Sequence, residues 1–208
     1  MKELFNLNSP WVQRFAMLTN LVILNILWLV CCIPVVTAGA ATTALYYTIF
    51  QYHTKVDDAV LQPFFHGLRS NFKQSTLLLL PILAILGLLG FDMVYLVSRG
   101  QGTAMLFLLF LAGLLIMGML VHLFPLIARF EMTPKALLRT AFSLVILHFP
   151  ATLLVIGLTL LPVFLLAVFP AQFLQFGVAW AGVWFAAIAY FFGKFLLKTW
   201  AKHIAPDA

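Results

Sequence analysis

Apolar residues in this chain fall into long segments that are separated by short polar ones. The apolar segments lie at about 10–32, 38–52, 74–97, 104–127, 140–164 and 176–197. A helix needs about 20 residues to cross a bilayer, and all but the second segment reach that length. The pattern therefore predicts a single all-α, polytopic membrane domain over residues 1–208, with about six transmembrane helices.

Residues 60–73 form an amphipathic pattern that runs directly into the apolar segment at 74–97. The apolar positions recur every three or four residues: Val60, Leu61, Phe64, Phe65, Leu68 and Phe72. This spacing predicts one apolar helical face, with Arg69 and Lys73 toward the other side. Such a helix lies at a membrane surface or docks against a partner. A second short cytoplasmic interfacial helix is predicted at 134–142.

A motif of the amphipathic segment recurs in similar form 70 positions later. The motif LRSNF at 68–72 returns as LRTAF at 138–142, and each leads into an apolar segment that contains one proline, Pro81 or Pro150. The shared order of cationic helix, apolar helix and proline predicts an internal two-helix repeat. The two repeat units are about 60–128 and 130–200.

Four residues predict helix breaks: Pro34, Gly39, Pro81 and Pro150. The first two frame a tight turn, and the small residues at 38–44 predict a helix that packs closely against others. The two later prolines would each free a carbonyl four residues back. Broken helices at corresponding repeat positions point to transporter binding sites, although proline kinks also serve plain packing.

The first two apolar segments leave alternatives open. Residues 37–40 look like a small-residue cleavage site, but the apolar region before them is longer than a signal-peptide core of about 7 to 15 residues, which argues against a signal peptide. The region 10–52 could also form one re-entrant hairpin, which would reduce the number of spans to four.

Charge fixes the expected orientation. With 64% hydrophobic and 9% charged residues, the composition excludes a soluble domain. The net charge of +6 does not indicate nucleic-acid binding, because no basic run alternates with exposed aromatic residues. If the N-terminus is cytoplasmic, only Arg99 of the 12 Lys and Arg residues lies outside. Both termini are therefore expected in the cytoplasm.

Asn25 and His148 are polar side chains at predicted membrane depth. Such groups either line a functional site or form an interhelical hydrogen bond. Asp92 and Arg99 are seven residues apart near the outer interface, where an ion pair is expected. Cys31 is followed directly by Cys32 within a predicted span, and the pair is interpreted as apolar residues of the span with no chemical role.

No arrangement of residues suggests catalysis. The chain has no Walker-type loop, no serine–histidine–aspartate set and no pair of carboxylates spaced for a metal. No enzyme activity, cofactor or metal is therefore expected. Arg69, Lys73 and Arg139 are instead the predicted partner-docking residues, on the cytoplasmic amphipathic helices.

Three segments carry a resemblance to a known family. Residues 24–47 read LNILWLVCCIPVVTAGAATTALYY, and this stretch, with 4–10 and 64–74, resembles the YesL-like family of bacterial integral membrane proteins. Members are often encoded beside carbohydrate ABC importers, so the resemblance implies a bacterial plasma-membrane protein linked to sugar uptake. It supplies no catalytic residues.

The expected function is a non-enzymatic accessory or permease-like component of a carbohydrate ABC-type uptake system. The expected partners are the lipid bilayer and ABC transporter subunits or another membrane protein, with no nucleic acid. A stand-alone transporter or channel for a small solute is the alternative, and a membrane-embedded sensor is a third option.

Overall fold

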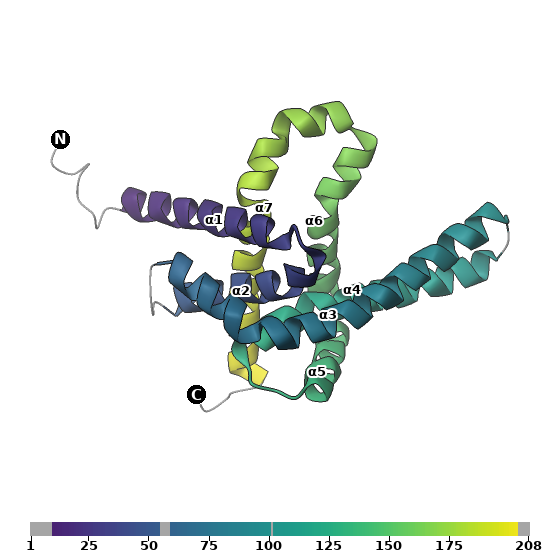
Figure 1. Cartoon of the computed structure of the whole chain (residues 1–208), viewed down its shortest axis with the longest axis horizontal. Coiled ribbons are helices and arrows are strands. Elements are labelled where there is room, and N and C mark those ends of the chain that lie inside the picture. The colour runs from purple at the N-terminus through teal and green to yellow at the C-terminus, as the bar shows by residue number, and fades with distance from the viewer. Residues whose placement is uncertain (1–9, 55–58, 101, 204–208) are drawn as a thin grey trace.

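The computed structural model describes residues 10–54, 59–100 and 102–203, and it contains only helices over these ranges (Figure 1). The seven helices are α1 (Pro10–Cys32), α2 (Val35–His53), α3 (Leu61–Ser98), α4 (Thr103–Arg129), α5 (Pro134–Leu147), α6 (Phe149–Val168) and α7 (Pro170–His203). The all-α prediction is confirmed. Four of the described helices are long and apolar enough to cross a membrane, namely α1, α3, α4 and α6. These helices support a membrane location, but six spans are not confirmed.

Helix α2 lies at the centre of the molecule and contacts α1, α3, α4 and α7. Its small residues allow these contacts, because Ala40, Ala41 and Ala44 are completely buried. Gly39 is inside α2, so the prediction of a helix break there is wrong. A Cβ atom at Gly39 would lie 3.0 Å from the carbonyl oxygen of Ser75 in α3, so this glycine serves close helix packing instead.

The chain between α1 and α2 turns sharply at Ile33 and Pro34, as expected for a proline between two helices. The Thr37 hydroxyl shares its one proton between the carbonyl of Cys31 and, at 2.8 Å, that of Pro34, the N-cap of α2. The contact with Cys31 holds the start of α2 against the end of α1.

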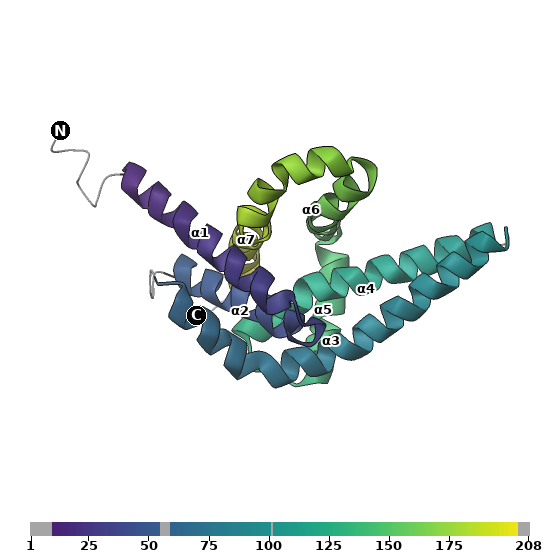
Figure 2. The same cartoon turned by 45° about the horizontal axis from the view of Figure 1, so that its top comes forward.

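Helices α3 and α4 form a long antiparallel hairpin that projects from the core (Figure 2). Its tip contains Gly100 and Gly102, whose φ angles of 64° and 81° favour glycine. Helix α3 has 38 residues and is about 57 Å long. The predicted interfacial helix at 60–73 and the span at 74–97 are therefore one continuous helix. Pro81 lies inside it and does not end it, since a membrane helix tolerates the loss of one backbone hydrogen bond.

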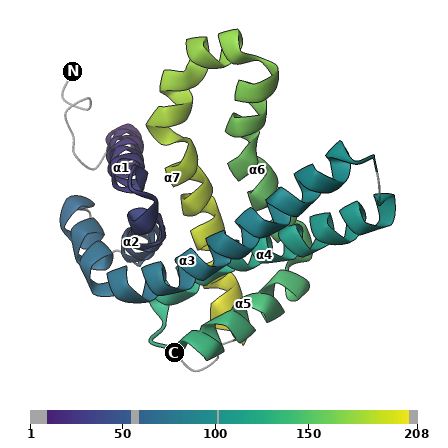
Figure 3. The ribbon, with the colours of Figure 1, turned by 45° about the vertical axis from the view of Figure 1, so that its right-hand side comes forward.

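The predicted span at 140–164 is divided into two helices at His148, whose φ and ψ angles are −117° and 36°. Pro150 is the second residue of α6, a position where the missing N–H costs nothing. The chain thus breaks two residues before the proline. Helices α6 and α7 form a second hairpin (Figure 3), and α7 begins at Pro170, where a turn as far as residue 175 was predicted.

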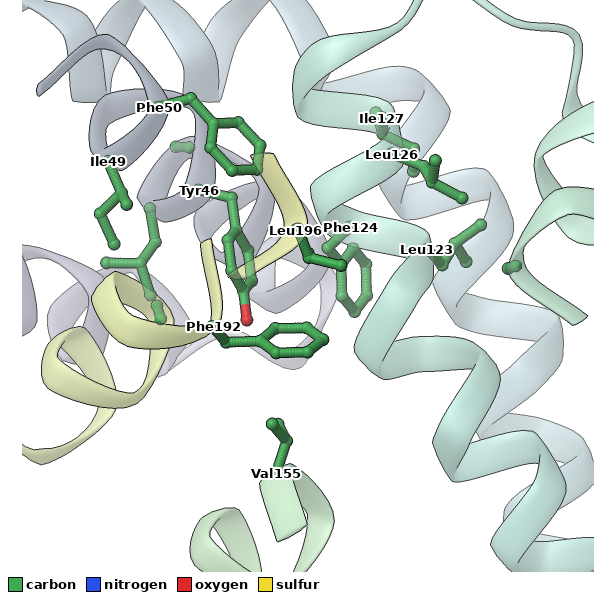
Figure 4. Close-up of a cluster of buried hydrophobic side chains, with 14 of the residues drawn as sticks. Tyr46, Ile49, Phe50, Leu123, Phe124, Leu126, Ile127, Val155, Phe192 and Leu196 are labelled. Atoms are coloured by element: carbon green, nitrogen blue, oxygen red, sulfur yellow. The ribbon is translucent and has the colours of Figure 1, made fainter. Parts of the chain in front are cut away.

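The core fills the space between α2, α4 and α7, where large apolar side chains meet (Figure 4). Its members include Ile49 and Phe50 from α2, Leu123 from α4, and Phe192 and Leu196 from α7. Small residues recur along α7 at Gly182, Ala186, Ala189 and Gly193. Ala186, Ala189 and Gly193 are buried, while no neighbouring atom lies within 4 Å of a Cβ built at Gly182.

Candidate functional site

The first part of α3 packs against the protein through one face, and its cationic side chains lie on the other face. Phe64 and Gly67 are buried, and a Cβ at Gly67 would lie 3.0 Å from the ring of Tyr47 in α2. Arg69 and Lys73 are exposed. The predicted apolar face is only partly covered by the protein, because three of its members are exposed: Leu61 by 52%, Phe65 by 43% and Phe72 by 37%. The exposed surface therefore combines cations with aromatic rings.

Helix α5 repeats this arrangement. Leu137 and Ala141 are completely buried, whereas Lys135 and Arg139 are exposed in the first two turns. Thr133 caps the helix by accepting a hydrogen bond from the N–H of Ala136 at 3.4 Å, and Pro134 follows at the first helical position. Further along the exposed side lie apolar side chains: Phe142, Ile146 and Leu147.

Exposure partly follows the 70-residue offset of the sequence motif. Several pairs of corresponding residues share the same exposure, while others do not match. The buried Phe64 corresponds to the exposed Pro134, and the exposed cation Lys73 corresponds to the uncharged Ser143. Five of the matching pairs are Gly67 and Leu137, Arg69 and Arg139, Phe72 and Phe142, Ser75 and Val145, and Leu77 and Leu147. The two segments thus present partly matching surfaces. They also differ where the second breaks at His148, since the corresponding Leu78 lies inside the uninterrupted α3.

The exposed surface changes from cationic to apolar at the base of each hairpin. On α3 the change falls between Lys73 and Leu77, and on α7 between Lys194 and Phe191. Arg99, at the tip of the first hairpin, lies 26 residues beyond Lys73, or about 39 Å along a helix. This distance is close to the thickness of a bilayer with its headgroups, about 40 to 45 Å.

A side-chain contact joins α3 to the beginning of α5. The amide nitrogen of Gln74 donates to the carbonyl of Met132 at 2.9 Å. Lys73 precedes Gln74, so the cationic end of α3 lies next to the segment that starts α5. We call the exposed Phe65, Arg69, Lys73, Lys135 and Arg139 the cationic surface.

The predicted ion pair between Asp92 and Arg99 is absent from the described structure. Both side chains are exposed, and the Arg99 guanidinium lies over the ring of Tyr95, 5.3 Å from its centroid. Residues seven apart on a straight helix share a face but are separated by about 10 Å, so the ring four residues away is the nearer partner.

Asn25 forms an interhelical hydrogen bond. The residue is completely buried, and its Oδ1 accepts from the backbone N–H of Ala186 at 2.9 Å. The side chain thereby joins α1 to the middle of α7. A polar residue at this depth either lines a functional site or forms an interhelical hydrogen bond, and the geometry of Asn25 matches the hydrogen bond.

His148 belongs to a buried polar cluster that the sequence did not reveal. His122 of α4 is completely buried, and its Nε2 lies 2.8 Å from the Thr152 hydroxyl. Thr152 in turn donates to the carbonyl of His148 at 3.0 Å. One hydroxyl proton serves the carbonyl, so the His122 Nε2–H donates to the hydroxyl oxygen. The cluster ties α4 to the helix break.

Close packing supports this cluster. A Cβ at Gly118, one turn before His122, would lie 3.1 Å from both Thr152 and Val145. His122 and Thr152 are 30 positions apart in sequence, and nothing in the residues around Thr152 indicates a hydrogen bond to a histidine. A glycine four residues before a histidine on an apolar helix was the available clue.

His53 lies at the end of α2, beyond its apolar part. Its Nε2 is 3.1 Å from the carbonyl oxygen of Tyr190 in α7. Burial lowers the pKa of His53 below its usual value, and the positive charge of Lys194 lowers it further, against the opposing effect of the hydrogen bond to Tyr190. The neutral ring is therefore the form that the fold favours.

In the comparison with known proteins, one family model matches part of the chain. A family model described as "Protein of unknown function, DUF624" matches residues 21–93, from α1 through most of α3. No curated protein and no solved structure matches the chain. The match includes two of the three segments that resemble the YesL-like family, namely 24–47 and 64–74. It places the most similar part of the chain in the central helix α2 and the two helices that flank it in sequence.

Proposed function

We propose that the protein is a non-enzymatic accessory component of the bacterial plasma membrane that docks to the permease subunits of a carbohydrate ABC importer. The cationic surface is the docking site. The observation that carries this proposal is the exposure of Arg69 and Arg139 at corresponding positions of two helices whose opposite faces are buried. The choice of an importer as partner rests on the resemblance to the YesL-like family.

A role as simple lipid anchors explains these helices less well. Phe64 and Gly67 already fix α3 against protein, and Leu137 and Ala141 do the same for α5. Neither helix needs lipid to hold it in place. Arginine and large aromatic side chains are also the residues enriched in the energetically important parts of protein interfaces. The exposed Phe65 and Arg69, one turn apart, have that character.

The proposed orientation places the cationic surface and both termini in the cytoplasm. Support comes from the two hairpins, because the base of each carries exposed lysine or arginine residues. Cytoplasmic segments of membrane proteins are enriched in these residues.

Stand-alone sugar transport is the rival, and the helix break at His148 favours it, since broken helices often form transporter sites. Asn25 and Thr152 already make hydrogen bonds within the protein, however, whereas the buried Nδ1 of His122 has no hydrogen-bond partner in the described residues. Asn25 bonds the backbone of α7, and Thr152 bonds both His122 and the His148 carbonyl. A sugar would need several additional hydrogen-bonding groups at one place. The docking function is therefore the better conclusion.

The test is co-purification with the permease subunits of the importer encoded nearest to this protein in its host. Glutamate at Arg69 and Arg139 should abolish recovery of the permease, because each interface arginine of this kind contributes on the order of 2 kcal/mol or more. Lysine at both positions keeps the charge and should retain part of the recovery. The variants should insert and melt like the wild type. Unchanged recovery with the glutamate variant would refute docking and favour the stand-alone transporter.

A further inference from the structure

A cavity of about 200 Å³ lies where α1, α2, α4, α6 and α7 meet, away from the cationic surface. Its lining is mainly apolar and includes Trp28, Met117 and Phe185. Apolar cavities of about 150 Å³ in other proteins hold a molecule as large as benzene. The space here is thus sufficient for a small organic molecule and is much larger than a single water.

Two hydroxyl groups line this cavity and make no hydrogen bond within the described protein. They belong to Tyr46 of α2 and Thr159 of α6. Tyr46 is only 6% exposed, and its ring is fixed by Phe50 and Phe192, with centroids 6.0 and 6.5 Å away. Figure 4 shows its hydroxyl pointing from α2 toward Phe192. This hydroxyl lines the cavity without a hydrogen-bond partner in the described residues, so an occupant of the cavity that bonds it gains affinity.

The other polar groups of the lining are already bonded. The Trp28 indole N–H donates to the Thr42 hydroxyl at 3.1 Å, and that hydroxyl donates to the carbonyl of Ala38 at 2.8 Å. No charged side chain lines the cavity. The lining therefore suits a neutral molecule and offers too few polar groups for a sugar.

We propose that the cavity binds a small neutral molecule with an apolar body and a single hydroxyl or carbonyl group, which hydrogen-bonds to Tyr46. The apolar body packs against the rings of Trp28 and Phe185, which contact each other with centroids 4.6 Å apart, and Thr159 offers a second polar contact in the lining. The site does not depend on the proposed docking function, because none of its lining residues belongs to the cationic surface.

Fluorine NMR on the full chain in detergent tests this site with two probes, 4-fluorophenol and fluorobenzene. Both should bind saturably above the background of empty micelles. Tyr46→Phe should weaken the binding of 4-fluorophenol by about five- to tenfold, which is the effect of one hydrogen bond. The affinity for fluorobenzene should stay unchanged. Tyr47→Phe is the matched control, since the Tyr47 ring faces Gly67 of α3 and not the cavity, and it should change neither probe.

A filling variant tests the location. Val121→Phe adds bulk at a half-buried lining position and should abolish saturable binding of both probes. If that variant does not fold, Thr159→Leu provides a second one. The proposal is overturned if neither probe saturates, if a filling variant leaves binding unchanged, or if Tyr46→Phe weakens both probes equally. It is also overturned if native mass spectrometry finds a phospholipid that only the filling variant loses, because an acyl chain would then be the occupant.

Discussion

The tight contact between α4 and the helix break makes Gly118 a sensitive position for substitution. A methyl group at Gly118 would lie 3.1 Å from Thr152 and 3.1 to 3.2 Å from two atoms of Val145. Both neighbours are almost completely buried, at 1% and 2% exposure, so neither can move into open space. Gly113, on the same helix, has no atom within 4 Å of its Cβ position and is the matched control.

Alanine at both glycines separates packing from helix propensity. Replacing a helical glycine by alanine stabilises by about 1 kcal/mol, and this gain should appear alone at Gly113. At Gly118 it is opposed by overpacking, which costs about 1 to 3 kcal/mol. Gly118→Ala should therefore be less stable than Gly113→Ala by about 1 to 3 kcal/mol.

Thermal unfolding in detergent measures this difference. A chain of this size changes its Tm by about 2 to 4 °C per kcal/mol, so the two variants should differ by roughly 2 to 12 °C. The Gly118→Ala variant should also lose part of the protection of the amides around His148 in hydrogen exchange. If Gly118→Ala melts at or above the temperature of Gly113→Ala, the packing at the break is not as described.

Three further predictions concern other parts of the molecule. Asn25→Leu should lower stability by about 1 kcal/mol, seen as a lower Tm, because the N–H of Ala186 loses its acceptor. The lowered pKa of His53 means that the fold favours its neutral form. This contribution is complete above a pH of about 6.5, the unfolded pKa, and is lost as the pH falls through that value toward the lower folded pKa. The melting temperature should therefore fall less between pH 7.5 and 5.5 in His53→Gln than in the wild type. For the orientation, a single cysteine at Ser98 should react with an impermeant thiol reagent on intact cells, and one at Ser70 should not, with Cys31 and Cys32 replaced by serine. The reverse pattern would invert the orientation.

Local chemistry predicted the turn at Pro34 and the helix that packs through small residues. Helix α1 ends and α2 begins on either side of this proline. The small residues at 38–44 lie in α2, where Ala40, Ala41 and Ala44 are completely buried. These features depend on residues close together in sequence, which is why the sequence reveals them.

Features that depend on distant contacts were missed. The sequence gives Pro81 and Pro150 the same role, yet α3 continues through the first and the chain breaks before the second. The difference lies in the surroundings, since the His148 carbonyl is bonded by Thr152, which itself contacts His122 on α4. No local pattern encodes a partner 30 positions away. Gly39 was likewise assigned to a turn, although its role depends on the approach of α3.

The most direct test of the docking function is site-specific photo-crosslinking in native membranes. A photoreactive amino acid at Ser70 would lie beside Arg69 on the cationic surface, and one at Leu88 would lie on the apolar side of the first hairpin, 67% exposed. The account predicts a crosslink from position 70 to a permease subunit of the carbohydrate importer and none from position 88. A crosslink to the permease from position 88 alone, or none from either position, would contradict it.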